Sequence, residues 1–245
     1  MDLQSLADQL DIPIDFFIDS LDIDERSRYE QDEGVQLIVV NIPIKNPKED
    51  KYTPPYITIP IGMIEVDDYI ITLSAYENPV INHLLSRLPK SFSTTDHSQL
   101  VLIVFEKTVD YFIHYLRMIN NQRGEYEKEL YNSTRNQELS SMMNLQKSLV
   151  YFLTNLRDNS MMMFKIQRTD FLRIQNNEEQ QDLFEDILID MEQAQDMAAT
   201  YSDILRNTME ALSSMISNNL NTIMKRLTSI TIVLMVPTLV ASFYG

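Results

Sequence analysis

The sequence contains no cysteine and no tryptophan, only four glycines, and 20 Lys and Arg residues against 36 Asp and Glu, for a net charge of −16. The absence of cysteine excludes disulfides, thiolate metal sites and cysteine nucleophiles. The shortage of positive charge argues against nucleic acid as a partner, because a phosphate backbone binds a basic surface. Residues 1–10 carry acidic side chains and no apolar segment, so we expect no secretory signal there.

The sequence also lacks the motifs of an enzyme. His83, His97 and His114 do not have the spacing of metal ligands, and four isolated glycines make no phosphate-binding loop. Scattered carboxylates form no catalytic pair without a shared geometry. We therefore expect a protein that is not an enzyme and that uses no organic cofactor.

Proline and glycine are unevenly distributed along the chain. Eight of the nine prolines lie at or before Pro89, whereas residues 90–236 contain no proline and a single glycine, Gly124. Long helices need such a gap, while sheets and loops rarely go so far without turn residues. The chain is therefore expected to divide near residue 95 into a small α/β part and a helical part.

The first part has the composition of short strands. Segments 35–44, 56–61 and 69–74 are rich in Val, Ile, Thr and Tyr and are bounded by Pro, Gly or acidic residues. Residues 78–88 begin with Asn and Pro and carry apolar residues at helical spacing, which predicts a helix. The apolar run 100–105 (LVLIVF) is interpreted as one more strand.

The second part predicts three helical stretches, at about 107–132, at about 136–167, and from 177 to 245. As one helix, the third stretch of 69 residues would be roughly 100 Å long, at about 1.5 Å per residue. A helix of that length cannot bury itself in so small a domain. We therefore expect a stalk that packs against copies of itself or enters another medium.

The stalk begins with an acidic zone. Residues 174–205 hold nine acidic residues and no Lys or Arg, and Asp182, Asp186 and Asp190 follow one another at intervals of four on one helix face. Such a face is either solvated or neutralised by divalent cations, because Mg²⁺ and Ca²⁺ prefer carboxylate oxygens as ligands. The pattern alone leaves both interpretations open.

Farther along, the stalk becomes apolar. Apolar residues recur at steps of three and four between 205 and 227, which fits a seam within the chain or between copies of it. Residues 229–245 carry no charge and stop mid-pattern, short of the roughly 20 residues of a full span, so we expect a truncated membrane-spanning segment. A buried core helix is the alternative. Lys225 and Arg226 precede the segment, which places residues 1 to about 228 on the cytoplasmic side by the positive-inside rule.

One face of this last segment carries amide, hydroxyl and thioether groups at steps of three and four. At membrane depth such side chains face a protein interface or a water-filled path. The stripe therefore predicts either a pore lining or hydroxyl groups that bond to their own backbone within a packed bundle. Its members are Asn221, Met224, Thr228, Thr231, Met235, Thr238 and Ser242.

Residues 217–245 closely resemble the junction of stalk and first transmembrane helix in the CorA family of divalent-cation channels. That family shows a SNxxNxxMKxLT…P…YGMN pattern. The sequence stops at the Gly of the Gly-Met-Asn triplet, and Pro237 lies one position later than in the family pattern. The rest of the chain shares the family's layout only. The matching residues are Ser217, Asn218, Asn221, Met224, Lys225, Leu227, Thr228, Tyr244 and Gly245.

The resemblance implies a homopentamer in the inner (cytoplasmic) cell membrane that transports Mg²⁺ and related divalent cations, cobalt among them. The first transmembrane helices would line the pore, with apolar constrictions at Met224, Leu227 and Met235. Tyr244 and Gly245 would begin the selectivity motif. The other implied pore-lining residues are Asn221, Thr228 and Thr238.

The resemblance also implies regulation by cytosolic Mg²⁺ bound between subunits. Asp186 falls at the family's stalk aspartate, in a partial match of Leu183-Phe184-Glu185-Asp186 to the family pattern YFxD. Asp182 and Asp190 are further candidate ligands by their spacing. Asp67 and Asp68 are candidate partner carboxylates from the α/β domain, chosen by acidity and turn position alone.

These expectations together describe an α+β chain. It would consist of a cytosolic α/β domain at 1–105, an antiparallel helical pair at 106–176, a stalk helix at 177–228 and the truncated transmembrane helix at 229–245. Two other functions stay open. A zinc transporter of the same family would share the architecture, and a membrane-tethered helical scaffold without transport would have no need for the polar stripe.

Overall fold

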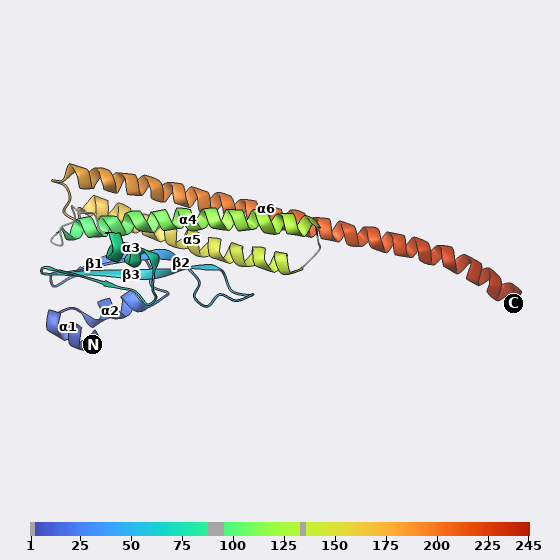
Figure 1. The fold of residues 1–245 in the computed structure, drawn as a ribbon, viewed down its shortest axis with the longest axis horizontal. Coiled ribbons are helices and arrows are strands. Elements are labelled where there is room, and N and C mark those ends of the chain that lie inside the picture. Colours follow the sequence, from blue (N-terminus) through green and yellow to red (C-terminus); the bar gives the residue numbers. More distant parts are fainter. Residues whose placement is uncertain (1–2, 88–95, 133–135) are drawn as a thin grey trace.

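The computed structural model describes residues 3–87, 96–132 and 136–245. A small sheet domain is followed by three long helices, the last of which extends far beyond the others (Figure 1). This is the α+β architecture that the sequence predicts. The elements in order are α1 (Leu3–Leu10), α2 (Ile14–Leu21), β1 (Arg28–Asp32), β2 (Val35–Lys45), β3 (Tyr56–Val66), β4 (Tyr69–Leu73), α3 (Pro79–Arg87), α4 (His97–Asn132), α5 (Asn136–Thr169) and α6 (Glu178–Tyr244).

The four strands form an antiparallel sheet in sequence order, β1-β2-β3-β4. The two central strands, β2 and β3, have 11 residues each and are almost completely buried. The reason is that α1 and α2 cover one face of the sheet, while the long helices cover the other (Figure 1). A strand that is covered on both faces has to be apolar at nearly every position, which is why these segments show little polar alternation.

Helix α2 lies directly against β3 at the single glycine of that strand. A Cβ atom at Gly62 would overlap Ser20 Oγ and would lie 3.3 Å from Ser20 Cα. Ser20 is fully buried, and its hydroxyl donates to the Phe16 carbonyl at 2.6 Å. Glycine is therefore required at this position because a Cβ atom would overlap the buried side chain of Ser20.

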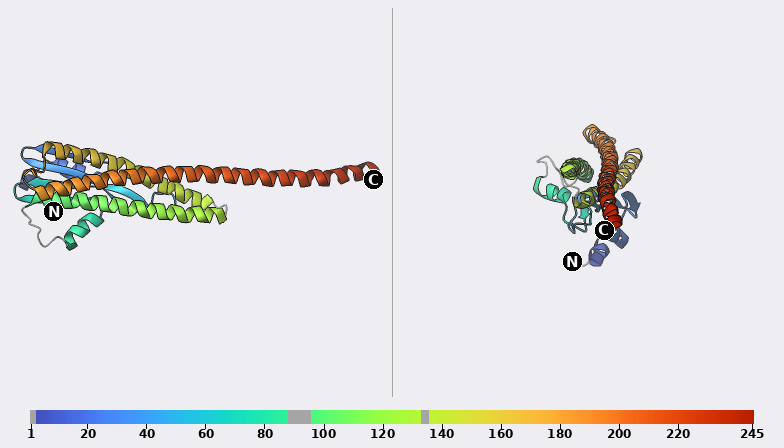
Figure 2. Two further views of the ribbon diagram at one scale, coloured as in Figure 1. Left: turned by 90° about the horizontal axis from the view of Figure 1, so that it is seen from above. Right: turned by 90° about the vertical axis from the view of Figure 1, so that its right-hand side faces the viewer.

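The three long helices share one apolar core with the inner face of the sheet. Seen end-on, α4 and α5 lie on opposite sides of α6 (Figure 2). Residues of α6 are buried from Gln180 to Leu212, and from there the helix continues as an uncovered rod to Tyr244 (Figure 2). The stalk is therefore fixed to the domain along roughly its first half only.

The prediction of a strand at 100–105 is wrong. These residues form part of the first turns of α4, which begins at His97. Val101, Leu102 and Phe105 are all buried, because this end of α4 lies between the sheet and the other two helices. A helix that is covered on every side is apolar around its whole circumference, so a short apolar run does not distinguish it from a buried strand.

The other predicted strands and helices are confirmed; most of their ends move by at most five residues, and the helix predicted from about 107 begins ten residues earlier, at His97. The segments at 35–44, 56–61 and 69–74 correspond to β2, β3 and β4, and the helix at 78–88 corresponds to α3. Leu88 and the division near residue 95 lie outside the described residues. Strand β1 and the two amino-terminal helices were not predicted.

Helix α5 binds the sheet through polar as well as apolar side chains. The pairing of β1 with β2 stops at Val39, so Asn41 has no strand partner on that side. Asn159 of α5 replaces the missing strand: its Oδ1 accepts from the Asn41 backbone N–H at 3.0 Å, and its Nδ2 donates to the Asn41 carbonyl at 2.7 Å. In the same manner, Ser148 Oγ accepts from the backbone N–H of Tyr56 at 3.1 Å.

Candidate functional site

The three stalk aspartates lie on the solvent side of α6. The helix buries its opposite side against α4 and α5, and Asp182, Asp186 and Asp190 are all exposed. Within the described part of the chain, no three His, Cys, Asp or Glu side chains come together in a group that could hold a metal ion. One chain therefore presents a carboxylate face that is incomplete as a cation site.

The beginning of this helix is held firmly in place. Asn177 caps it, since its side chain accepts from the backbone N–H of Gln180 at 3.2 Å. Gln180 Nε2 donates in turn to Asp96 Oδ2 at 2.8 Å, while Asp96 Oδ1 accepts from the backbone N–H of Gln99 at the start of α4. The amino-terminal ends of α4 and α6 are thereby joined, and the acidic zone starts from a fixed point.

Asp67 and Asp68 lie at the turn between β3 and β4. Both are exposed, and Asp67 has a φ of 48°, in the left-handed region that Asp tolerates better than most residues. Neither belongs to a three-carboxylate group with the stalk aspartates among the described residues. Their role as partner carboxylates stays a prediction.

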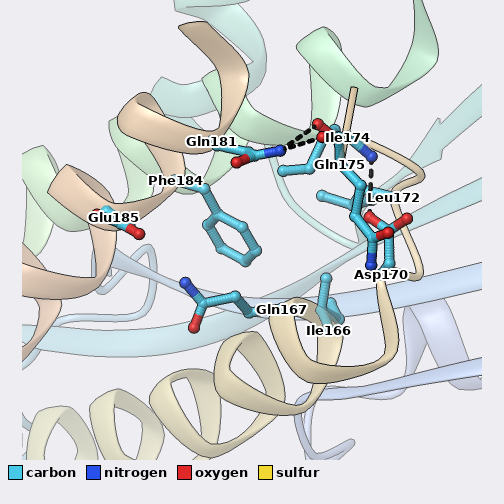
Figure 3. Close-up of a pocket in the computed structure, with 9 residues that line it drawn as sticks. All are labelled: Ile166, Gln167, Asp170, Leu172, Ile174, Gln175, Gln181, Phe184 and Glu185. Atoms are coloured by element: carbon cyan, nitrogen blue, oxygen red, sulfur yellow. Dashed lines mark hydrogen bonds between the residues drawn. The ribbon is translucent and has the colours of Figure 1, made fainter. Parts of the chain in front are cut away.

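A cavity of about 170 Å³ lies beside the acidic zone, where α5 turns into α6 (Figure 3). Asp170 and Glu185 are the carboxylates that line it. Asp170 Oδ1 accepts from the backbone N–H of Ile174 at 3.0 Å, and Gln181 Nε2 donates to the Ile174 carbonyl at 3.1 Å and to the Gln175 carbonyl at 2.6 Å. These polar groups stabilise the turn that sets the direction of α6, so we assign the cavity a structural role.

The last part of α6 carries a long apolar surface. An 18-residue window there has a mean hydropathy of 1.8, and none of it is buried. Among the described residues, α6 is the one helix that is long and apolar enough to cross a membrane. Monomeric soluble proteins rarely expose so large an apolar surface, so a bilayer or further copies of the chain have to cover it.

The six predicted pore-lining residues lie along one side of this uncovered helix, and all are exposed. Two of them also make backbone bonds: the Thr228 hydroxyl donates to the Met224 carbonyl at 2.8 Å and the Thr238 hydroxyl to the Leu234 carbonyl at 2.7 Å. Each bond uses the hydroxyl hydrogen and leaves the oxygen free to accept. Backbone bonding and a polar lining are therefore compatible. The six residues are Asn221, Met224, Leu227, Thr228, Met235 and Thr238.

Helix α6 runs without interruption through Pro237 as far as Tyr244. Proline has no N–H, so the carbonyl of Val233 loses its usual helical partner at this point. Membrane helices tolerate such a position because neighbouring groups satisfy the carbonyl. Gly245 follows with its N–H donated to the Ala241 carbonyl at 2.9 Å, so the two residues that resemble the start of the selectivity motif stand at the end of the helix.

A row of polar residues on α5 was not predicted from the sequence. Asn144 Nδ2 donates to the Lys51 carbonyl at 2.9 Å and Asn155 Nδ2 to Thr58 Oγ1 at 2.7 Å, in addition to the contacts of Ser148 and Asn159. The signal was present as Asn and Ser at steps of four, seven and four. This row fixes α5 to the sheet, and α5 packs against the stalk, so it connects the sheet domain to the acidic zone.

Comparison with known proteins gives one consistent result. The family model for the CorA-like Mg²⁺ transporter protein matches residues 1–245. The cobalt/magnesium transport protein CorA of Methanocaldococcus jannaschii is 27% identical over 256 residues, which cover 100% of this chain and 75% of that protein. The complete structure of the CorA magnesium transporter from the same organism aligns with a TM-score of 0.82 at 25% identity, over 99% of this chain and 75% of the other. The cytoplasmic domain of ZntB from Vibrio parahaemolyticus shares the fold, with a TM-score of 0.63 at 12% identity over 90% and 84% of the two chains.

Proposed function

The chain belongs to the CorA-like Mg²⁺ transporter family, and from this membership we propose that it forms the cytosolic domain and first transmembrane helix of a homopentameric channel for Mg²⁺. Members of this family are membrane-bound transporters of divalent cations. Residues 1 to about 228 would lie on the cytoplasmic side. The observation that carries the proposal is the uncovered apolar part of α6, with its polar stripe on one side only.

A ring of such helices would place the stripe on a central path. Met224, Leu227 and Met235 would then form apolar rings, which are able to close a pore by expelling water. Asn221 and Thr238 would form rings of neutral oxygen atoms. Mg²⁺ gives up its water reluctantly, and its bound water molecules donate hydrogen bonds. The free acceptor capacity of a back-bonded threonine hydroxyl suits a hydrated ion of this kind.

We further propose that the incomplete carboxylate face of α6 regulates transport. Cytosolic Mg²⁺ would bind between the Asp186 side chain of one subunit and carboxylates of its neighbour, with Asp182 and Asp190 as further ligands. When Mg²⁺ falls, repulsion between the acidic faces would loosen the interface and favour the open state. A ligand shifts such an equilibrium only through its different affinity for the two states, so the cation has to bind the closed arrangement more tightly.

The proposal is tested by cation uptake into proteoliposomes that contain the protein at its natural length. We expect Mg²⁺ uptake that does not depend on a proton gradient and that is inhibited by Mg²⁺ on the side of the cytosolic domain. Asp186→Lys places a positive charge where the cation would bind, and it should abolish this inhibition. Glu210→Lys makes the same change of charge on the same helix outside the acidic zone, and it should leave inhibition intact.

The alternatives give different results in the same assay. Zn²⁺ uptake driven by a proton gradient would assign the protein to zinc transport. No uptake of either ion would favour a membrane-tethered scaffold. Unchanged Mg²⁺ inhibition in Asp186→Lys would remove the regulatory role of that residue while leaving the channel proposal in place.

A further inference from the structure

The polar stripe of α6 is interrupted at two positions, and both are methionine. At about 3.6 residues per turn, the seven residues of the stripe lie within about 100° of the helix circumference. Five of them carry an amide or a hydroxyl group, and the other two are Met224 and Met235. Each methionine has a polar residue of the stripe three or four positions before it and another three or four positions after it. The stripe would therefore be polar along its whole length if these two side chains became polar.

The rest of the chain covers neither of these side chains. Met224 is 58% exposed and Met235 is 63% exposed, whereas Met191 of the same helix is fully buried. Met224 also precedes Lys225 and Arg226, so in the proposed channel it lies at the cytoplasmic end of the pore, within reach of small molecules from the cytosol. The sequence has no cysteine, and an oxidant that attacks sulfur therefore attacks methionine.

Oxidation converts the apolar side chain of methionine into a polar one. Hydrogen peroxide transfers one oxygen atom to the thioether sulfur: the S–O bond forms, the O–O bond breaks, and the second oxygen leaves as water with both protons of the peroxide. The sulfur loses two electrons and the peroxide gains them. The resulting sulfoxide oxygen accepts hydrogen bonds, and methionine sulfoxide reductases restore the thioether.

From these observations we infer that oxidation of Met224 and Met235 by a peroxide opens the pore. The inference rests on the channel proposed above, in which both residues form apolar rings. Such a ring closes a pore because water leaves it, whereas a ring of sulfoxide groups holds water in place. Of the three proposed apolar rings, only that of Leu227 at the edge of the stripe then remains. A dry gap one ring long, with polar groups before and after it, is too short to exclude water.

Oxidation acts on the pore itself and leaves the acidic zone unchanged. The acidic zone ends at residue 205, and the 19 steps of helix from there to Met224 span roughly 28 Å at about 1.5 Å per residue. The carboxylates that would bind cytosolic Mg²⁺ are therefore not affected by the sulfoxide groups. The oxidised channel accordingly conducts at Mg²⁺ concentrations that close the unmodified channel, until reduction restores the apolar rings.

The first test measures Mg²⁺ uptake into proteoliposomes that contain the protein at its natural length, at a Mg²⁺ concentration that inhibits uptake. Each variant is compared with itself before and after treatment with hydrogen peroxide. We expect peroxide to raise uptake by the wild type about tenfold, the equivalent of one hydrogen bond gained in the oxidised ring. Methionine sulfoxide reductase should reverse this rise. Met224→Leu combined with Met235→Leu keeps the rings apolar without sulfur, and it should show no rise.

Met215→Leu is the matched control for these variants. Met215 is 42% exposed on the uncovered part of α6, and it lies nine residues, or about two and a half turns, before Met224. It therefore faces the side of the helix opposite the stripe, and Met215→Leu should retain the rise. A further variant, Met224→Gln, carries a permanent polar group in the ring and should raise uptake without peroxide.

Peptide mass spectrometry of the same samples records which methionines have gained an oxygen atom. If Met224 and Met235 are oxidised and uptake does not rise, the inference is wrong. It is also wrong if these two residues stay unmodified while Met215 is oxidised, or if the double leucine variant responds to peroxide as the wild type does. If the untreated wild type takes up no Mg²⁺ at any concentration, the channel proposal fails instead.

Discussion

Replacing Asn159 by alanine tests how the sheet domain is joined to the helices. The side chain is fully buried and satisfies both backbone groups of Asn41, which is 2% exposed. Its loss leaves a buried N–H and a buried C=O without their partner, at about 1–3 kcal/mol for each group. Ser27 Oγ lies 3.3 Å from the Asn41 nitrogen and still accepts from its N–H, so part of the lost hydrogen bonding is replaced. We therefore expect the local free energy of opening to fall by about 2–4 kcal/mol.

Hydrogen exchange of the full chain, followed by mass spectrometry, measures this local free energy directly. Since about 1.4 kcal/mol corresponds to a factor of ten, the protection of β2 peptides around Asn41 should fall by about 30- to 1000-fold. Asn155→Ala is the matched control one turn away, because Asn155 bonds only to the Thr58 hydroxyl and to a carbonyl of its own helix. If Asn159→Ala lowers the protection of β2 no more than Asn155→Ala does, the reasoning about orphaned strand groups is refuted.

Three further changes have defined outcomes. Gly62→Ala forces a Cβ atom into Ser20 and should destabilise the packing of α2 by about 1–3 kcal/mol, seen as faster exchange in α2 and not in α5. The backbone N–H of Tyr52 donates to Asp50 and holds the pKa of that exposed carboxyl below its usual value of 3.8. The bonded loop is therefore fully stabilised above a pH of about 4, and this stabilisation is lost as the pH falls through the lower pKa of the folded chain. The chemical shift of the Tyr52 amide measures this change. Thr238→Val removes a proposed ring of oxygen atoms and should lower Mg²⁺ uptake by about tenfold, the equivalent of one hydrogen bond, while Thr238→Ser retains it.

The central strands could be predicted from the sequence because burial on both faces leaves a clear composition. Strand β1 could not, since Arg28–Asp32 (RYEQD) is almost entirely polar and adopts a strand by pairing with Val35–Val39. Edge strands of this kind take their conformation from a neighbour and not from their own propensity. Helices of eight residues such as α1 and α2 are marginal in isolation, so the packing of Phe16 and Phe17 under the sheet decides that α2 forms.

Only part of the candidate site could be predicted from the sequence. The acidic zone and the polar stripe are periodic features of one helix, and a single sequence shows them directly. The contacts that hold this helix in place lie on other elements: Asn159 of α5 bonds to Asn41 of the sheet, 118 positions away, and Gln180 at the start of α6 bonds to Asp96, 84 positions away. Neither relation has a local signature, because contacts between distant segments depend on how the helices are registered against one another.

The continuity of α6 explains why such contacts far from the membrane matter for a channel. Asp182 and Met224 belong to one unbroken helix, and the 42 steps from one to the other span roughly 63 Å at about 1.5 Å per residue. A tilt of about 5° at the acidic end would therefore move the apolar end by about 5 Å. The sheet domain is able to control this tilt only if α5 is fixed to the sheet and the stalk is fixed to α5. Asn159→Ala should accordingly weaken inhibition of flux by Mg²⁺ together with the protection of β2, and inhibition that stays intact while β2 opens would show that the stalk moves independently of the sheet.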